Sequence, residues 1–239
     1  MSTELTVGQW VVKRPSNARV FERFGIDYCC GGKLPLTKAC QNKGVDTQTV
    51  IDALAQNEQQ SDQTDRDWSA ASFGEITRHI ESTHHAYLKN ELPRLEELAA
   101  KVADRHGDSH PELRRLHEIF AAFKTDLESH MFKEERILFP HCRTFDDPET
   151  SGASFHCGSV QNPVAVMVHE HDRAGEDLSQ MRKLTGDYIP PDGACNSYRA
   201  LFARLAELEA DMHRHVHLEN NILFPRAIAA EKKQPPCGA

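Results

Sequence analysis

The chain has 239 residues, enough for one large domain or two small ones, and its formal net charge of −8 at pH 7 argues against nucleic acid as a partner. No apolar run approaches the roughly 20 residues of a membrane span, so the sequence predicts no membrane segment. The N-terminal residues lack the basic and apolar regions of a signal peptide, and the seven cysteines are expected to be reduced thiols, so we expect a cytoplasmic location.

The first predicted domain is small and helical and covers residues 1–58. Short amphipathic segments are expected near Ala18–Phe24, Leu36–Lys43 and Thr47–Gln56. Asp46 is expected to cap the last of them, because its side chain can accept a backbone N–H of the first turn. A loop that contains adjacent cysteines and glycines joins the first two segments.

A polar stretch, residues 59–71, is predicted to be a linker to a larger domain. The larger domain, residues 72–231, is predicted to be a four-helix bundle, which makes the chain all-α. The tail, residues 232–239, is predicted to be disordered. The four bundle helices are expected at about residues 72–104, 109–142, 162–185 and 196–231.

Local signals mark the start of two of these helices. Ser72 and Glu75 have the spacing of a capping box, and so do Ser109 and Glu112. Pro93 lies inside the first helix and predicts a kink there, because proline removes a backbone hydrogen bond.

One motif occurs twice in the larger domain, Asp-x3-His-x3-Glu-x2-Ile-Leu-Phe-Pro, beginning at Asp126 and at Asp211. Its His and Glu are four residues apart and therefore lie on one helix face, one turn from each other. A further histidine precedes each motif by about 45 residues, so the unit is a helical hairpin that is used twice. The two hairpins supply six candidate metal ligands: His85, His130, Glu134, His171, His215 and Glu219.

A single His-x3-Glu pair is usually a solvated pair on a helix surface, but the apolar flanks of these histidines oppose that interpretation. Met167 and Leu178, for example, place His171 on the buried stripe of its helix. Burying imidazoles and carboxylates without partners would cost several kcal/mol, and a bound metal removes that cost. The pattern therefore favours a metal centre over structural histidines.

Two adjacent histidines leave the first ligand open at this point. Apolar spacing favours His84, which lies in line with Ile80 and Leu88. His85 instead has Glu81 four residues before it, and a carboxylate one turn away can accept the other ring N–H of a ligand histidine. On this second ground we expect His85 to be the ligand.

The same spacing predicts supporting carboxylates at Asp126 and Asp211, each four residues before the histidine of its motif. Glu170 is next to His171 and points about 100° away from it on a helix. We expect Glu170 to influence metal release or ligand entry rather than primary binding, with a solvated carboxylate as the alternative.

The donor set of four imidazoles and two carboxylates indicates which metal would bind. Structural zinc sites often include cysteine, and magnesium and calcium prefer oxygen ligands alone. Mixed histidine and carboxylate ligands in a helical bundle suit iron or manganese. Glu134 and Glu219 could each bridge two ions, which would leave positions for a bridging oxo or hydroxo group and for a small ligand such as O₂ or NO.

Further motifs narrow the assignment. They are Asp27-Tyr-Cys-Cys-Gly-Gly32, Glu170-His-Asp-Arg-Ala-Gly-Glu176 and Leu218-Glu-Asn-Asn221. With them the chain resembles the Repair of Iron Centres family over nearly its whole length. The resemblance implies a hemerythrin-like four-helix bundle after a small helical domain, two non-haem iron ions (Fe²⁺ or Fe³⁺), and a bacterial cytoplasmic setting. It also implies repair of iron–sulfur clusters damaged by nitric oxide or peroxide, and it supports His85 as the ligand.

Three functions are compatible with these features. The leading one is a stress-response protein that supplies iron to damaged iron–sulfur proteins. The second is an enzyme that reduces NO, and the third is a hemerythrin-like sensor of O₂ or NO. NO turnover with an electron donor would identify the second, and iron transfer to an apo-cluster protein would identify the first. No catalytic residue is assigned, and the oligomeric state stays open, a homodimer included.

The adjacent Cys29 and Cys30 are predicted to be a redox-active or iron-transfer pair, with a buried pair of small side chains as the alternative. The glycines that follow them favour an open backbone and accessible thiols. Three cysteines depart from the family pattern, Cys142, Cys157 and Cys195, and they are expected to be inert thiols or an added redox element.

Overall fold

The computed structural model of the chain describes residues 4–60, 66–147 and 158–233. Within these ranges the elements are helices, apart from one isolated β-bridge between Thr6 and Pro35, so the predicted all-α class is confirmed. None of the helices in this described part is long and apolar enough to cross a bilayer. Part of the predicted linker, most of the predicted tail and Cys157 lie outside the described residues.

The chain forms two compact units that do not follow the order of the sequence. Unit 1 comprises Met1–Thr77, Cys142–Val164 and His213–Ala239, and unit 2 comprises Arg78–His141 and Ala165–Met212. The boundaries expected around a linker at 59–71 stay a prediction.

Unit 1 begins with four short helices. They are α1 (Val7–Lys13), α2 (Asn17–Arg23), α3 (Leu36–Lys43) and α4 (Thr47–Gln60). Thr6 accepts the backbone N–H of Gln9 and caps α1, a helix that the sequence pattern did not predict. Asp46 accepts the N–H of Thr49 at 2.8 Å and caps α4, as predicted. Their shared core includes Val7, Trp10, Phe21, Tyr28, Leu36, Val50 and Leu54.

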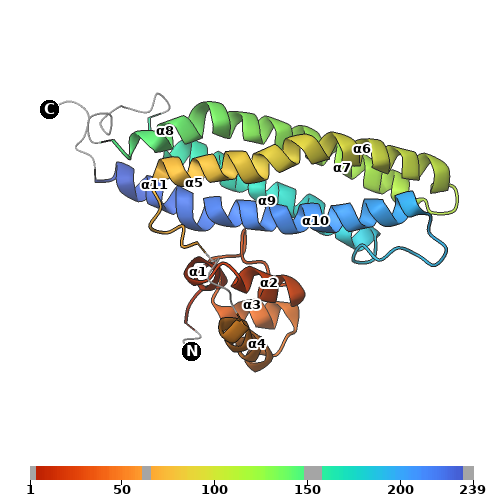
Figure 1. Cartoon of the computed structure of the whole chain (residues 1–239), viewed down its shortest axis with the longest axis horizontal. Coiled ribbons are helices and arrows are strands. Elements are labelled where there is room, and N and C mark those ends of the chain that lie inside the picture. Colours follow the sequence, from red (N-terminus) through yellow and green to blue (C-terminus); the bar gives the residue numbers. More distant parts are fainter. Residues whose placement is uncertain (1–3, 61–65, 148–157, 234–239) are drawn as a thin grey trace. The chain divides into compact units, whose positions relative to one another are not determined.

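Unit 2 contains most of the predicted four-helix bundle, which Figure 1 shows as long helices running side by side. The helices are α6 (Ala86–His106), α7 (Glu112–Lys133), α9 (Gln161–Leu184) and α10 (Asn196–Leu218). Lys124 of α7 pairs with Glu96 of α6 at 2.9 Å, and Arg182 of α9 pairs with Glu209 of α10 at 2.9 Å. Apolar side chains on the facing sides are buried and include Leu88, Leu92, Leu116, Phe120, Met181 and Leu205.

The first bundle helix starts as the sequence predicted. It begins with α5 (Phe73–His79), and the backbone N–H of Glu75 donates to the Ser72 hydroxyl at 3.1 Å. The N–H of Ser72 donates back to the Glu75 carboxylate at 2.9 Å, which completes the capping box.

The predicted capping box at the second helix is wrong. Helix α7 begins at Glu112, and Pro111 occupies the N-cap position without a side-chain hydrogen bond. The Ser109 hydroxyl donates instead to the carbonyl of His106, at the end of α6. Proline suits a helix start because its φ is already helical and it has no N–H to satisfy there.

Three of the predicted continuous helices are interrupted by π-helical turns. The turns are η1 (Ile80–His85), between α5 and α6; η2 (Glu134–Leu138), between α7 and α8 (Phe139–Thr144); and η3 (Glu219–Leu223), between α10 and α11 (Phe224–Glu231). Each turn contains one of the predicted metal ligands, so the interruptions belong to the architecture of the candidate site.

Candidate metal centre

Unit 2 brings four of the six predicted ligands together. His85 lies on η1, His130 on α7, Glu134 at the start of η2 and His171 on α9, and all four side chains are buried. One carboxylate oxygen of Glu134 lies 3.4 Å from Nε2 of His85, and the other lies 3.3 Å from Nε2 of His130. Nε2 of His171 lies 3.0 Å from Nε2 of His130.

These distances show that the ligand atoms of several side chains lie close together. His130, Glu134 and His171 offer ligand atoms within 4.8 Å of one another. Because the two oxygens of Glu134 face different histidines, this carboxylate has the geometry to bridge two ions. A mixed set of imidazole and carboxylate in a buried position fits iron, since the metal would offset the cost of burying these groups.

Unit 1 holds the other two predicted ligands, one helical turn apart. Nε2 of His215 on α10 lies 3.0 Å from a carboxylate oxygen of Glu219 on η3, and both side chains are fully buried. The spacing therefore places this His-x3-Glu pair on one helix face, as the sequence indicated. The assignment of all six residues as ligands stays a prediction.

Two of the three π-helical turns, η2 and η3, have a cause in the sequence of the repeated motif. The backbone N–H of Phe139 donates to the carbonyl of Glu134, five residues earlier, and the N–H of Phe224 donates to that of Glu219 in the same way. The residues that follow are Pro140 and Pro225, which have no N–H and disturb the α-helical hydrogen bonds around them. The motif Ile-Leu-Phe-Pro thus favours a π turn that begins at the glutamate of each ligand pair, a feature often found at functional sites.

The other ring nitrogen of two predicted ligands is held by a carboxylate from elsewhere in unit 2. Nδ1 of His85 donates to Glu135 at 2.9 Å, and Lys89 donates to the same carboxylate at 2.6 Å. Burial alone raises the pKa of Glu135, but the hydrogen bonds from Lys89 and His85 outweigh it and hold the pKa below its ordinary value. The carboxylate therefore stays ionised and fixes the orientation of the imidazole.

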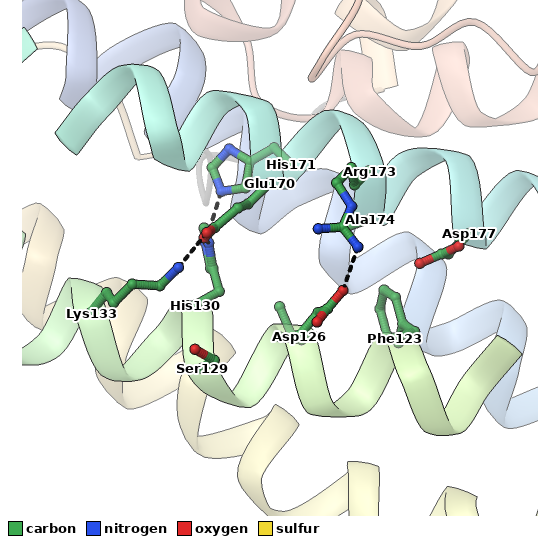
Figure 2. Close-up of a pocket in the computed structure, with 11 residues that line it drawn as sticks. Phe123, Asp126, Ser129, His130, Lys133, Glu170, His171, Arg173, Ala174 and Asp177 are labelled. Carbon is green, nitrogen blue, oxygen red and sulfur yellow. Dashed lines mark hydrogen bonds and ion pairs between the residues drawn. The ribbon is translucent and has the colours of Figure 1, made fainter. Parts of the chain in front are cut away.

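His130 has the same arrangement. Its Nδ1 donates to Glu170 at 2.8 Å, and Lys133 is hydrogen-bonded to the other oxygen of Glu170. Burial raises the pKa of Glu170, and the hydrogen bonds from Lys133 and His130 lower it further than that, so the net shift is downward. Figure 2 shows Glu170 between Lys133 and His130, with His171 beside them.

These pairings differ from the carboxylates that the sequence predicted. Nδ1 of His85 is bonded to Glu135 rather than Glu81, and Nδ1 of His130 to Glu170 rather than Asp126. The reason is that each ring faces a neighbouring helix, and a residue of its own helix one turn earlier does not lie in that direction.

Asp126 and Asp211 are the other two expected supporting residues, and each pairs with a residue of another helix; support of His215 by Asp211 stays a prediction. Asp126 pairs with Arg173 at 2.8 Å, and both side chains are more than half exposed. Asp211 accepts from Nδ1 of His84 at 2.9 Å. The two adjacent histidines of η1 therefore face different carboxylates, His84 toward α10 and His85 toward η2.

A pocket between α7 and α9 reaches two of the predicted ligands. His130 and His171 are part of its lining, and Glu170 and Lys133 lie beside them (Figure 2). The remaining lining residues include Phe123, Asp126, Leu127, Ser129, Arg173, Ala174 and Asp177. The pocket offers a small ligand or a chelator a route to the imidazoles of unit 2.

The adjacent cysteines of unit 1 are both reduced. Their sulfur atoms lie 4.0 Å apart, and the Cys29 thiol donates to Asp27 at 3.2 Å. The hydrogen bond with Cys30, burial and the Asp27 charge all raise the pKa of Cys29 well above its ordinary value. Asp27, Cys29 and Cys30 form a compact group of three donors, but the buried Cys29 is less accessible than the sequence suggested.

Among the additional cysteines, Cys142 is buried and Cys195 is exposed. The Cys195 sulfur lies 3.2 Å from Nε2 of His106 in unit 2. The burial of Cys142 agrees with the expectation of an inert thiol.

Comparison with known proteins finds a family match for each of the two predicted domains. The hemerythrin HHE cation binding domain matches residues 76–227, and a domain of unknown function, DUF542, matches residues 3–58. The iron-sulfur cluster repair protein YtfE of Dickeya chrysanthemi is 38% identical over 226 residues, which cover 95% of this chain and 97% of the relative. The protein of the same name from Escherichia coli O157:H7 is 35% identical over 225 residues, covering 94% and 97%. The chain belongs to the family of these proteins, the Repair of Iron Centres family that its motifs indicated.

Proposed function

We propose that the protein binds two non-haem iron ions and supplies iron to iron–sulfur proteins damaged by oxidative or nitrosative stress. The observation that supports it best is the carboxylate of Glu134, whose two oxygens lie 3.4 Å and 3.3 Å from imidazoles of His85 and His130. A carboxylate with a histidine at each oxygen suits two ions rather than one. The names of the relatives support the repair of clusters as the purpose of the iron.

The six proposed ligands are His85, His130, Glu134, His171, His215 and Glu219. The two irons supply redox activity and open coordination positions when they are bound. A bridging oxo or hydroxo group and NO or O₂ as small ligands belong to the same proposal. A cytoplasmic location and the absence of nucleic acid as a partner stay predictions.

Four of the six proposed ligands have a task that their own chemistry supports. The imidazoles of His85 and His130 are oriented by Glu135 and Glu170, so they present Nε2 without rotating. Glu134, and Glu219 by analogy, would hold both ions if they were bound, and a carboxylate could then also hold one ion alone. A change from two ions to one would release an ion without unfolding the helices, which is what a donor of iron requires.

Glu170 also lines the pocket that reaches His130 and His171. We propose that it affects iron release through this pocket, as its position in the sequence indicated. Cys29 and Cys30 are proposed to accept iron or nitrosyl groups afterwards, because thiolates are softer ligands than imidazole or carboxylate.

The test is iron transfer from the purified, iron-loaded protein to an apo iron–sulfur protein under argon, followed by the activity that the rebuilt cluster restores. We expect two irons per chain before transfer and recovery of the acceptor in step with iron loss. The His130→Ala variant serves as a control that should carry less iron and restore less activity. One metal per chain, or an iron-loaded protein that restores no acceptor, would contradict the proposal. Sustained consumption of NO with an electron donor would support the enzymatic alternative instead.

A further inference from the structure

Asn221 connects the cysteine loop with the π turn that carries Glu219. Both lie in unit 1, and Asn221 is the third residue of η3, two residues after Glu219. The side-chain amide of Asn221 donates to the backbone carbonyl of Tyr28 at 3.3 Å and to that of Cys29 at 3.1 Å. One amide group therefore binds the backbone carbonyls on both sides of the Cα atom of Cys29.

Two glycines make room for this amide. A Cβ atom at Gly8 would lie 2.5 Å from Oδ1 of Asn221, and one at Gly32 would lie 2.4 Å from the same atom. The backbone N–H of Gly8 donates to the carbonyl of Gly32 at 2.9 Å, so the two walls of the slot are bonded to each other. Any larger residue at either position would displace Asn221.

Aromatic contacts bury the residue that precedes the cysteines. The Tyr28 ring meets the rings of His213 and His217 edge to face, with centroids 6.1 Å and 5.5 Å apart. Its hydroxyl donates to Glu22 at 2.9 Å. Tyr28 is 1% exposed and Cys29 is 5% exposed, so the loop is closed over the segment that includes Glu219.

A purely structural attachment of the cysteine loop to η3 would be enough to explain these hydrogen bonds and buried rings. Two features indicate that Asn221 also links Cys29 to Glu219. The fastening amide acts on the backbone of Cys29 itself, and it belongs to the same five-residue turn as the predicted ligand Glu219. A displacement of Glu219 in this short turn must therefore move Asn221, because only one residue separates them.

We propose that Asn221 is a positioning residue that couples the accessibility of Cys29 to the state of Glu219. The inference rests on the proposed function, in which Glu219 is a metal ligand and Cys29 a receiving thiol. When Glu219 is coordinated, η3 is fixed and Asn221 holds the loop closed. When Glu219 is released, η3 gains freedom, the loop opens, and the thiol becomes accessible as iron leaves.

The test measures the rate at which Cys29 reacts with iodoacetamide in the full-length protein, by peptide mass spectrometry that resolves Cys29 from Cys30. We expect Cys29 to react about tenfold more slowly with ferrous iron bound than without it, a factor typical of one hydrogen bond. Asn221→Asp keeps the shape of the side chain and replaces its donor by an oxygen that repels the two carbonyls. In this variant we expect fast reaction in both states.

Asn90→Ala is the matched control. Asn90 has an exposed side-chain amide, which donates to the carbonyl of Ala86 in the same helix, α6. It should keep the dependence on iron. Gly32→Ala is the second test and leaves the sequence of η3 unchanged. Its Cβ atom would lie 2.4 Å from Oδ1 of Asn221 and 2.7 Å from the carbonyl oxygen of Tyr28, so it should separate these two groups and also give fast reaction in both states. Equal rates in the wild type with and without iron, or an undiminished iron dependence in Asn221→Asp and Gly32→Ala, would overturn the proposal.

Iron content and transfer to an apo-cluster protein are measured on the same samples. A wild type that shows iron-dependent labelling but transfers no iron would refute the proposed function and keep the coupling. A wild type that transfers iron, but whose Cys29 reacts equally fast with and without iron, would refute the coupling and keep the proposed function.

Discussion

At the scale of single residues, His84 and His85 show how neighbouring side chains acquire different tasks. His85 has Nε2 at 3.4 Å from Glu134 and Nδ1 on Glu135, whereas Nδ1 of His84 is bonded to Asp211. We expect His85→Ala to lose most of its iron, because the variant removes a donor and leaves Glu134 buried beside a cavity. Elemental analysis and the visible absorption spectrum of the purified variant measure this.

His84→Ala is the matched variant and should keep most of its iron and an unchanged spectrum. Its removal breaks the hydrogen bond with Asp211, so a modest loss of stability is expected, about 1–3 kcal/mol. Full iron content in His85→Ala together with loss in His84→Ala would mean that the ligand is His84.

Glu135 is a second residue whose task emerges only from the structure. It joins His85 to Lys89, and the hydrogen bonds from these two keep its carboxylate ionised. We expect Glu135→Gln to weaken iron binding about 10–100-fold, the usual effect of losing the residue that orients a ligand histidine. Competition with a chromophoric chelator gives the affinity directly.

The control is Glu128→Gln, which alters an exposed carboxylate of α7 near Lys124. It should bind iron as tightly as the wild type. Equal affinity in Glu135→Gln and Glu128→Gln would show that the orientation of His85 does not depend on Glu135.

The residues that the sequence could not reveal share a physical cause. A His-x3-Glu spacing reports on one helix face, so it found pairs such as His130 with Glu134. Glu135 and Asn221 act across helices or across a loop, and no periodicity of their own sequence marks that contact. Asn221 belongs to a motif that the sequence marked, Leu218-Glu-Asn-Asn221, but the motif does not show which backbone its amide contacts.

At the scale of helices, the π turns decide where the carboxylate ligands point. Removing the extra residue of such a turn would rotate Glu134 by about 100° relative to the helix that follows. We expect Pro140→Ala to relax η2 toward an α-helix, to leave the iron-free protein folded, and to weaken iron binding about tenfold through a misplaced Glu134. Circular dichroism follows the fold, and chelator competition follows the affinity.

Pro93→Ala is the matched control, because Pro93 also lies inside a helix, α6, but eight residues after η1. It should leave iron affinity unchanged. If Pro140→Ala binds iron as tightly as Pro93→Ala, the proline of the motif does not set the position of Glu134.

The helices themselves follow closely from the sequence, and the departures have local explanations. Amphipathic periodicity placed α9 and α10 to within one residue at their N-terminal ends, because their buried faces are long. Helix α1 was missed, since it has only seven residues and its capping box uses Thr6 and Gln9. The π turns were missed because an inserted residue does not break the apolar pattern enough to be seen.

At the scale of the whole molecule, the predicted ligands are divided between the two units, and the cysteine loop shares unit 1 with two of them. Four predicted ligands belong to unit 2, whereas His215, Glu219 and the cysteine loop belong to unit 1. The six predicted ligands include no cysteine, so binding of iron and its delivery through the cysteine pair can be separated by substitution. The repeated motif supplies one His-x3-Glu pair to each unit, His130 with Glu134 to unit 2 and His215 with Glu219 to unit 1.

The separation predicts a variant that binds iron but does not deliver it. In Cys29→Ser/Cys30→Ser, the oxygen atoms replace sulfur without touching the six proposed ligands, so two irons and the native spectrum are expected. Repair of a nitrosylated cluster protein should fall strongly, because hydroxyl groups are poor ligands for ferrous iron compared with thiolates. Iron analysis and recovery of the acceptor's activity measure the two properties on one sample.

Cys195→Ser is the matched control, an exposed thiol of unit 2 whose loss should leave both properties unchanged. The raised pKa of Cys29 adds a second signature, because the reactive thiolate is scarce at neutral pH and its fraction grows as pH rises toward that pKa. Transfer through Cys29 should therefore accelerate with increasing pH in the wild type and in Cys195→Ser. Unimpaired repair by the double serine variant would make the cysteine pair structural, and the proposed ligands would then have to deliver iron without it.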